Sequence, residues 1–549
     1  MARHAWERRE VWGNDVAGGG IVSEVMRRTL SYRPRYADPP RQAAAPRTPP
    51  GDAPGGLTRR ADGRVAGPDS DWGIRSRLGR LERSWWVLGG ALLLALLANE
   101  LGAQVAPVPR GPIARRAIDS ALAVATADSA WARVKHTYYD TTFRGLDWEA
   151  VGAEVRARAA RARDERELRA AITAMFDRLG ESHFALVPSG AVEHGRAAPS
   201  EEDSLGTAGI ELRLLRGRVV VSRVVPGSAA AGAGVRAGWW LERVGALEVA
   251  PLVRTRLASL DGAARRLAEL QLTLSLAART HGRAGERLRL AFRDGRGRRR
   301  PVRLVLRRDD AELVRFGPLP PQLVRFESRR LDDAAGCVGV VRFNAWMAPV
   351  APRFDDAMAE YRHCRGVILD LRGNVGGVAA MVMGVGGYVL DSAVSLGTMT
   401  TRGAALRYVA NPRRSDRRGR PLAPYAGELA ILVDGMSAST SEIFAAAMQV
   451  LGRARVFGEP TAGQALPAML APLPNGDVMQ HVVGDFVAPD GRRLEARGVV
   501  PNVQIQLSRA ALLAGRDEVL RAALSWIGGG ATATSRATAS TRRATPATW

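Results

Sequence analysis

The segment 428–452 restricts the fold of this chain more than any other. It begins with a continuous apolar run, 429–433, of strand length, and it ends with an Ala-rich helical pattern closed by Gly452. The turn between the two patterns places Ser439 at the start of the helix. A serine at such a junction has an exposed hydroxyl, and the helix N–H groups beside it can hold a developing anion. Ordinary helix capping explains the same pattern, so the rest of the chain has to decide between the two interpretations.

Length and charge restrict the class of protein. A chain of 549 residues is expected to form about two to four domains, and an apolar fraction of 46% is enough for packed cores. The net charge of +24 is typical of proteins that bind nucleic acid or a membrane surface. However, Lys135 is the only lysine, and the arginines are spread along the whole chain instead of forming one patch. We therefore expect no nucleic-acid partner.

The cysteines and histidines indicate neither a metal site nor a cofactor. The two cysteines, Cys337 and Cys364, have no CxxC or metal-ligand spacing, and the seven histidines are scattered without an HExxH motif. If the protein is exported, a Cys337–Cys364 disulfide is a further expectation, because disulfides persist in oxidising compartments. The geometry of the two residues has to decide whether they pair.

The N-terminal part of the chain is expected to direct export. Residues 1–84 are rich in Arg, Pro and Gly without sustained periodicity, so we interpret them as disordered or as an extension outside the native protein. Residues 85–106 follow a series of arginines and contain an apolar run that suits a signal peptide or a membrane anchor. A buried core helix is the alternative. The expected location is therefore the periplasm, the cell envelope or the membrane surface.

Residues 112–200 are predicted to form an N-terminal helical domain. Apolar residues recur at three- and four-residue spacing over 118–135 and 148–179. A polar turn follows, in which Ser182 and His183 are adjacent.

Residues 205–310 change to short β-like runs. The segment 226–238, with a Pro-Gly-Ser turn before a short helix, resembles part of a PDZ domain. PDZ domains bind a peptide C-terminus as an added strand, so the resemblance implies that backbone amides near Gly209 and Ile210 hold its carboxylate. A small β-domain without a peptide role is the alternative. The stretch 251–283 has helical character and is interpreted as an insertion.

Residues 311–527 alternate between strand and helix patterns, which predicts an α/β core. The apolar runs 338–344 and 366–372 are expected to be strands, and 353–362 is expected to be the helix between them. The last residues, 528–549, are rich in Gly, Ala, Thr and Ser, and we expect a disordered tail there.

Several features in a fixed order resemble one family. The helical region and the PDZ-like segment are followed by LDLRGNVGG at 369–377, SASTSE at 437–442 and GEPTAG at 458–463. Together they resemble the C-terminal processing (tail-specific) serine peptidases. The resemblance implies a multidomain α/β protein whose core is similar to the crotonase and Clp-protease superfamily. It also implies hydrolysis of peptide bonds with Ser439 as the nucleophile.

The usual base of this family is missing. Many relatives activate the serine with a lysine 25 residues further on, where this chain has Gln464. A glutamine amide cannot take a proton at neutral pH, and Lys135 belongs to the helical region. The chain therefore has to use another base, or it is inactive.

A histidine and a glutamate offer an alternative. The Ser182-His183 pair resembles the Ser-His pair of the tricorn-type branch of the family, and LEARGVVP at 494–501 resembles the block that carries its glutamate. The resemblance implies that His183 is the general base, that Glu495 orients it, and that Ser182 assists.

Each of these assignments has an alternative. His183 could be a structural histidine, and Glu495 could brace the turn that follows it. Glu459 and Glu442 are weaker rivals for the orienting role, and His481 is the rival base.

The oxyanion hole is expected to come from two backbone amides. One is that of Thr440, directly after the nucleophile, and the other is that of Gly376 or Gly377, because glycine lets the backbone approach a substrate closely. Gln464 is expected to line the substrate cleft.

These expectations combine into one function and one alternative. We expect an exported serine endopeptidase that cleaves unfolded or C-terminally exposed polypeptides by acyl transfer and contacts the membrane through 85–106. Its partners are protein or peptide substrates, and the sequence is compatible with an oligomer. The alternative is a catalytically inactive, PDZ-bearing binding protein on the same scaffold.

Overall fold

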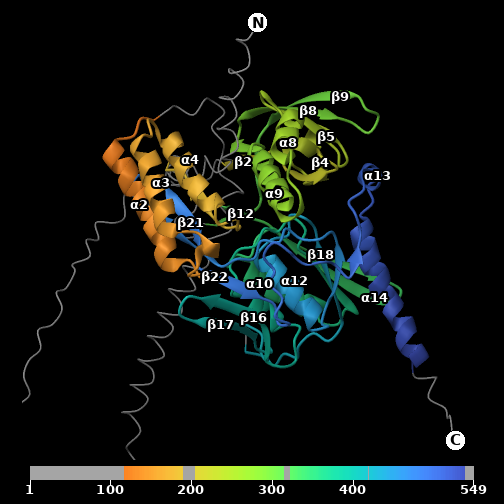
Figure 1. The fold of residues 1–549 in the computed structure, drawn as a ribbon. Coiled ribbons are helices and arrows are strands. Elements are labelled where there is room, and N and C mark those ends of the chain that lie inside the picture. The colour runs from red at the N-terminus through yellow and green to blue at the C-terminus, as the bar shows by residue number, and fades with distance from the viewer. Residues whose placement is uncertain (1–115, 190–204, 315–321, 418, 538–549) are drawn as a thin grey trace, which may run out of the picture. The chain divides into compact units, whose positions relative to one another are not determined.

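A six-stranded, largely parallel sheet forms the centre of the core (Figure 1). The computed structural model describes residues 116–189, 205–314, 322–417 and 419–537. The strand order is β13-β14-β15-β18-β19-β23, in which β13 is antiparallel to β14 and all later neighbours are parallel. The strands are β13 (Phe326–Asp333), β14 (Gly336–Phe343), β15 (Gly366–Asp370), β18 (Glu428–Val433), β19 (Arg455–Gly458) and β23 (Val503–Gln504).

Helices cover both faces of this sheet, which is why its strands are continuous apolar runs. Helix α14 (Glu518–Ala537) lies along β18 on one face (Figure 1). Helices α10 (Val350–Tyr361) and α12 (Thr440–Val450) contribute to the larger hydrophobic cluster on the other face. Successive side chains of a strand point to opposite faces of the sheet, so they belong to two different hydrophobic clusters. The side chains packed with α14 are Val338, Val340, Ile368, Ala430, Leu432 and Phe457. The predicted α/β core, with its two strands and the helix between them, is confirmed.

The prediction of a disordered tail from residue 528 is wrong for 528–537, because α14 continues to Ala537. The apolar face of the helix over 519–527 packs on the sheet and establishes its first turns. Each residue added to an existing helix gains one backbone hydrogen bond. A composition rich in small and polar residues is therefore not enough to end α14. Residues 538–549 lie outside the described residues.

The predicted N-terminal extension, 1–84, and the apolar segment, 85–106, also lie outside the described residues. Within the part of the chain that the structure describes, no helix is both long and apolar enough to cross a membrane.

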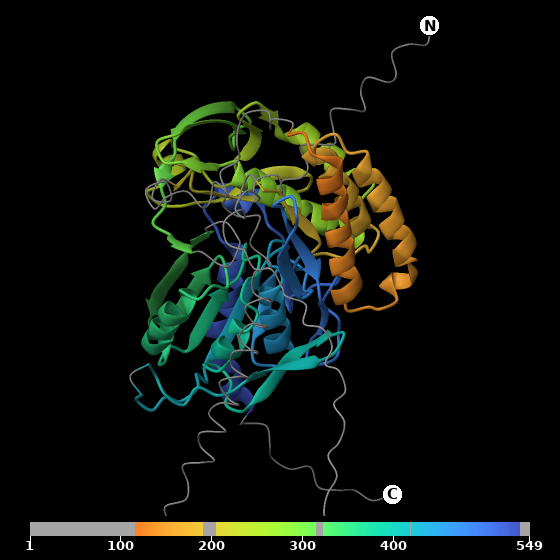
Figure 2. The same ribbon diagram turned by 90° about the vertical axis from the view of Figure 1, so that its left-hand side faces the viewer.

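Three helices form the N-terminal helical region and pack side by side (Figure 2). They are α2 (Ser120–Thr137), α3 (Trp148–Ala160) and α4 (Glu165–Asp177), with a 3₁₀ turn at Phe143–Gly145. The single helical pattern predicted over 148–179 is thus divided in two. Asp164 causes the division, because its carboxylate caps α4 by accepting a hydrogen bond from Glu167 N at 2.9 Å.

A short strand after these helices joins the helical region to the core. Strand β1 (Ala185–Val187) pairs antiparallel with β21 (Val478–Val482), which also pairs with β20 (Ala468–Pro472). Core residues Leu473 and Met479 belong to the same hydrophobic cluster as the helices. The helical region is therefore continuous with the core, and the turn between α4 and β1, which carries Ser182 and His183, is held from both sides.

The β-rich part between residues 205 and 308 contains two sheets and three helices. Its larger sheet has the order β3-β4-β5-β8-β9 with β6 paired to β5, and its smaller one has the order β10-β2-β7. The bounds are β2 (Leu205–Thr207), β3 (Ile210–Leu215), β4 (Arg218–Val224), β5 (Trp240–Val244), β6 (Leu247–Glu248), β7 (His281–Arg283), β8 (Arg287–Arg293), β9 (Arg299–Val305) and β10 (Arg307–Arg308). The helices are α7 (Ala229–Gly232), α8 (Val249–Leu257) and α9 (Gly262–Ala278), so the helical character predicted for 251–283 is found as far as Ala278, whereas His281–Arg283 form β7.

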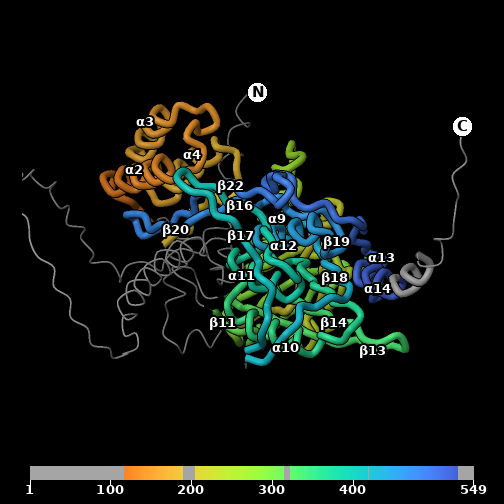
Figure 3. Tube along the Cα trace, turned by 90° about the horizontal axis from the view of Figure 1, so that it is seen from below, coloured from red at the N-terminus to blue at the C-terminus, as the bar shows by residue number. Residues whose placement is uncertain are grey.

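The remaining elements surround the core sheet. A long hairpin of β16 (Val394–Thr401) and β17 (Ala405–Ala410) pairs with β22 (Gly484–Val487), as the tube in Figure 3 makes visible. The others are β11 (Glu312–Val314), β12 (Gln322–Val324), α11 (Met381–Gly386) and α13 (Arg509–Leu513).

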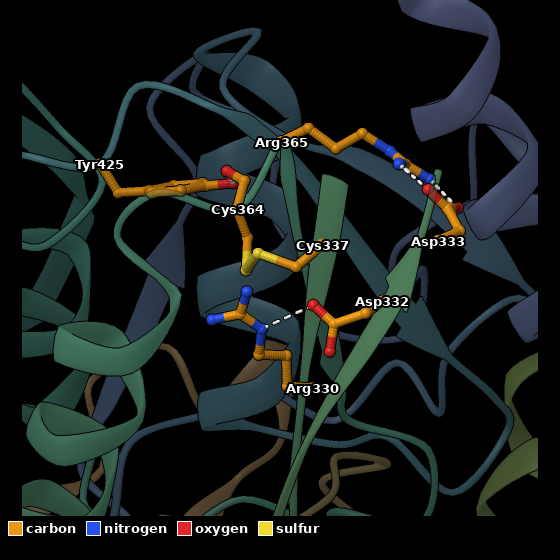
Figure 4. Close-up of a disulfide and its surroundings, with 7 residues drawn as sticks. All are labelled: Arg330, Asp332, Asp333, Cys337, Cys364, Arg365 and Tyr425. Carbon is orange, nitrogen blue, oxygen red and sulfur yellow. Dashed lines mark hydrogen bonds and ion pairs between the residues drawn. A yellow bond between two sulfur atoms is a disulfide. The ribbon is translucent and has the colours of Figure 1, made fainter. Parts of the chain in front are cut away.

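A disulfide joins two neighbouring strands at one edge of the sheet (Figure 4). Cys337 is the second residue of β14, and Cys364 lies two residues before β15. The two strands are parallel neighbours, so their starting ends lie together. The ion pair between Arg365 and Asp333 extends this connection to β13. The expected Cys337–Cys364 disulfide is therefore confirmed.

Candidate active site

Ser439 stands in the turn between β18 and α12, at the carboxyl edge of the parallel sheet. This edge is where open α/β sheets bind ligands. The backbone of Ser439 has φ 55° and ψ −117°, a conformation that side chains disfavour and that therefore needs support from its surroundings. Its N–H donates to Gln464 O at 2.7 Å and to Glu442 Oε2 at 3.0 Å.

Asn374 connects this turn to the loop after β15. Asn374 O accepts hydrogen bonds from Ala438 N at 3.1 Å and from Ser441 Oγ at 3.0 Å. The side chain of Asn374 donates to Phe343 O and accepts from Gly376 N, both within 3.0 Å. The two loops at the sheet edge are thus joined into one unit.

Asp434 makes a second connection at the same edge. Its Oδ1 accepts from Gly373 N and from Met436 N at 3.0 Å each, and its Oδ2 accepts from Arg213 Nε at 2.6 Å. Because Arg213 belongs to β3, the β-rich part contacts the two loops directly.

The two glycines predicted for the oxyanion hole differ in whether their backbone N–H groups already have an acceptor. The N–H of Gly376 already donates to the Asn374 side chain. No acceptor among the described residues faces the N–H of Gly377 or that of Thr440. Thr440 Oγ1 donates to Gly377 O at 2.9 Å, which fixes these two peptide groups beside each other. A Cβ at Gly377 would lie 2.4 Å from Trp346 O, so only glycine fits there. The geometry therefore leaves Thr440 and Gly377 as the free donors.

His183 and Glu495 come together through Ser182. Ser182 Oγ lies 2.5 Å from His183 Nδ1, and Ser182 N donates to Glu495 Oε1 at 3.0 Å. The other carboxylate oxygen, Oε2, accepts from Ala465 N at 3.0 Å. His183 has φ 65°, so this turn too is held in a conformation that side chains disfavour.

The consecutive residues 464 and 465 join these groups to the nucleophile. Gln464 O accepts from Ser439 N, and the next residue donates from its N–H to Glu495. Three distant parts of the chain, which carry Ser439, Glu495 and the Ser182-His183 pair, are thereby brought to one place.

Burial sets the protonation of this group. It lowers the pKa of His183 to about 3, so the imidazole is neutral at pH 7. Burial also raises the pKa of Glu495, while hydrogen bonds from Ser182 and Ala465 act in the opposite direction.

The structure places two of the rival residues, His481 and Glu459, away from Ser439. His481 is buried between β21 and α2, where its Nδ1 lies 3.0 Å from Thr137 Oγ1, and burial lowers its pKa to about 4. Glu459 accepts from Leu507 N at 2.8 Å. The only lysine, Lys135, forms an exposed ion pair with Glu149. Gln464 is buried beside Ser439, and its Nε2 has no partner among the described residues.

Sequence analysis missed Glu181. This buried carboxylate accepts from Tyr138 Oη at 2.6 Å, from Tyr139 Oη at 2.8 Å and from Arg493 Nη2 at 2.7 Å. Since it precedes Ser182 and binds a residue two positions before Glu495, it fixes the distance between the two turns. Its position directly before the Ser-His pair was the available signal.

The predicted carboxylate-binding residues of the β-rich part line a cavity of about 160 Å³. Strand β3 and helix α9 form one wall, and the core contributes Phe343 and Met436 to the other. Ile210 is the first residue of β3, but the N–H of Gly209 already donates to Thr207 Oγ1 at 3.0 Å. A carboxylate would have to displace this hydroxyl, which corrects the expectation of a free Gly209 amide. No metal-binding group of three or more His, Cys, Asp or Glu residues occurs in the described ranges.

Comparison with known proteins finds two family models. Residues 337–505 match Peptidase family S41, and residues 128–177 match the Tricorn protease C1 domain. The carboxyl-terminal-processing protease of Picosynechococcus sp. is 25% identical over 381 residues, which cover 68% of this chain and 81% of that protein. The probable CtpA-like serine protease of Staphylococcus epidermidis is 24% identical over 175 residues, which cover 32% of this chain and 34% of that protein.

Two solved structures align with this chain at low sequence identity. The photosystem II D1 C-terminal processing protease aligns with a TM-score of 0.48 and 21% identity over 70% of this chain and 93% of that one. The tricorn protease aligns with a TM-score of 0.40 and 16% identity over 74% of this chain and 37% of that one. Residues 337–505 are thus a peptidase family S41 domain, and together with the curated relatives this match indicates that the chain is a serine-type peptidase.

Proposed function

We propose that this peptidase cleaves polypeptides with a Ser-His-Glu triad in place of the Ser-Lys dyad. Ser439 is the nucleophile, His183 is the general base, and Glu495 orients His183 through Ser182. The observation that supports this most is the hydrogen bonding of residues 464 and 465, which ties Ser439 on one side to Glu495 on the other. Gln464 itself carries no group that can take the proton of the serine.

In this proposal, acyl transfer proceeds as follows. Neutral His183 takes the Ser439 proton as the hydroxyl oxygen attacks the scissile carbonyl carbon, and the Nδ1–H of the resulting imidazolium donates to Ser182 Oγ. Glu495, which accepts a hydrogen bond from Ser182 N, stabilises the imidazolium by its negative charge. The developing oxyanion accepts from the free N–H groups of Gly377 and Thr440. His183 then protonates the leaving amine, and a water activated by the same imidazole hydrolyses the acyl-enzyme.

The substrates of this proposal are unfolded or C-terminally exposed polypeptides. The β-rich part, residues 205–310, acts as a PDZ-like unit that receives a tail along β3, near Gly209 and Ile210. The Picosynechococcus relative is a carboxyl-terminal-processing protease, which agrees with such a substrate. The core is proposed to share the architecture of the crotonase and Clp-protease superfamily.

We further propose that the protein works outside the cytoplasm. The Cys337–Cys364 disulfide supports this location, because structural disulfides are rare in reducing compartments. The apolar segment 85–106 would supply the export signal or the anchor.

Labelling with a fluorophosphonate probe tests the triad. Wild type is expected to be labelled, and Ser439→Ala and His183→Ala are expected to abolish labelling with unchanged circular dichroism. His481→Gln is the matched control, because it changes a buried histidine without contact to the site, and it should keep the label. If folded wild type stays unlabelled with and without a hydrophobic C-terminal peptide, the inactive binding protein becomes the better interpretation.

A further inference from the structure

Glu442 is a buried carboxylate beneath the nucleophile, and the proposed triad does not use it. It lies in the first turn of α12 and has no exposed surface. Its Oε2 accepts from Ser439 N at 3.0 Å and from Gln464 N at 2.8 Å. Its Oε1 accepts from Gly463 N at 2.7 Å and from Thr461 Oγ1 at 2.5 Å.

All four partners of this carboxylate are donors. Three are backbone N–H groups, which can only donate. The fourth, Thr461 Oγ1, also accepts from Val499 N at 2.7 Å, so its own hydrogen is directed to Glu442. A protonated carboxyl would point its O–H at one of these donors and lose an acceptor site. Only the ionised form satisfies the arrangement.

The four donors belong to segments that carry the proposed catalytic groups. Ser439 is the nucleophile, Gly463 and Gln464 lead into the N–H that binds Glu495, and Thr461 holds the loop that follows Glu495. The packing is close: a Cβ at Gly498 would lie 2.7 Å from Thr461 Oγ1 and 3.1 Å from Glu442 Oε1. A change at this carboxylate therefore moves all three segments.

We propose that the ionised carboxylate of Glu442 is a positioning group that holds the nucleophile in register with the Glu495 loop, so that protonation of Glu442 switches the peptidase off. This inference rests on the proposed triad and adds a control of its activity by pH. Glu442 does not contact the substrate in this proposal and acts only through the residues that it holds.

The charges around Glu442 are compatible with such a switch. Helix α12 carries no other ionisable residue, and Glu442 forms no ion pair within the described ranges. On the neighbouring segments, Asp434 is paired with Arg213, Glu459 accepts from Leu507 N, and Glu495 binds Ser182 and Ala465. The remaining charged residue, Arg497, is exposed.

The pKa of Glu442 lies near neutral pH, so the carboxyl changes its protonation there. Burial raises its pKa to about 7, against the opposing effect of its four hydrogen bonds. The pKa of His183 is lowered to about 3, so the histidine does not titrate near neutrality. A loss of activity on acidification through pH 7 is therefore expected to report Glu442.

The first test follows fluorophosphonate labelling rates as a function of pH. In wild type the rate should rise with a midpoint at about pH 7. Glu442→Gln should slow labelling on the order of 10²-fold, since small displacements of a nucleophile have such effects, and it should lack the inflection. Glu459→Gln is the matched control, a neighbouring half-buried glutamate outside the arrangement, and should keep the inflection. An unchanged rate and inflection in Glu442→Gln would overturn the proposal.

A second test does not depend on activity. Amide hydrogen exchange should show protected N–H groups at residues 463 and 464 in wild type above pH 7, and loss of this protection in Glu442→Gln with the rest of the core unchanged. Equal protection in both proteins would refute the positioning role. If wild type is not labelled at all, the triad fails as a proposal, whereas exchange still decides the role of Glu442.

Discussion

Three residues of the site have backbone conformations that side chains disfavour. Ser439, His183 and Ala496, the neighbour of Glu495, have φ values of 55°, 65° and 61°. Such conformations cost about 1–3 kcal/mol each and persist only where the surroundings determine them. Each of these residues lies in a different one of the three chain segments that carry the proposed triad. The hydrogen bonds of Glu442, Glu495 and Asn374 therefore do more than satisfy polar groups, because they keep three strained turns in place.

The contribution of Glu442 to the free energy of unfolding should fall as the pH rises, whereas activity is expected to increase. The folded-state pKa of about 7 exceeds the unfolded value of 4.5, so the folded protein binds the proton more tightly. The contribution of Glu442 to the free energy of unfolding is thus fully present below pH 4.5 and is lost as the pH rises to about 7. The loss is about 3 kcal/mol by the usual 1.36 kcal/mol per pKa unit.

Thermal unfolding of wild type and Glu442→Gln checks this linkage. Glutamine does not titrate, so the stability of the variant relative to wild type should increase between about pH 5 and pH 8. The same pH dependence in both proteins would show that Glu442 is not protonated in the folded state near neutrality.

The sequence predicted the identity of most residues of the proposed site, but not the contacts that they make. Ser439, His183 and Glu495 could be named from the sequence because their motifs resemble those of a family. The contacts between these residues could not be predicted from the sequence, because they depend on backbone groups of residues 464 and 465 that no side-chain pattern reveals. Glu442 stands three residues after Ser439, the spacing of a capping box, but this spacing says nothing of Thr461 and Gly463.

At the scale of elements, strands and helices followed from local pattern where burial was uniform. The apolar runs 366–372 and 429–433 are strands covered on both faces, so their sequences alone are diagnostic. Strand β1 is only three residues long, and its partner β21 lies almost 300 positions further on. No local signal predicts such a pairing, which is why the continuity of the helical region with the core was not anticipated.

The disulfide is expected to stabilise the core without taking part in catalysis. It closes a loop with a sequence separation of 27 around α10, for which the loss of unfolded-state entropy corresponds to about 3 kcal/mol. Replacing both cysteines by serine should therefore lower the midpoint of thermal unfolding by several degrees.

Fluorophosphonate labelling at 25 °C distinguishes this role from a catalytic one. The double variant should be labelled at the wild-type rate while it is folded, because Cys337 and Cys364 lie at the starting ends of their strands, opposite the edge that carries Ser439. A labelling rate that falls in step with disulfide reduction in the folded protein would contradict this prediction.

At the scale of the whole molecule, the proposed triad is shared between two parts of the fold. Ser439 and Glu495 belong to the core, whereas His183 belongs to the turn after the helical region. That turn reaches the core through the β1–β21 pairing and through the apolar cluster around the helices, in which Leu473 is 5% exposed. Activity should consequently depend on packing that lies outside the site.

Leu473→Ala tests this dependence, with Ile527→Ala as its control. Both remove a large buried side chain, and each should lower the free energy of unfolding by about 2–5 kcal/mol. Ile527 packs α14 on the far face of the core sheet, so its loss should leave labelling of Ser439 unchanged under conditions where both variants are folded. Leu473→Ala should slow labelling, because a loosened helical region holds the turn with Ser182 and His183 less firmly against Glu495. Equal labelling rates in the two variants would mean that the β1–β21 pairing and the polar contacts of Glu181 position the histidine by themselves.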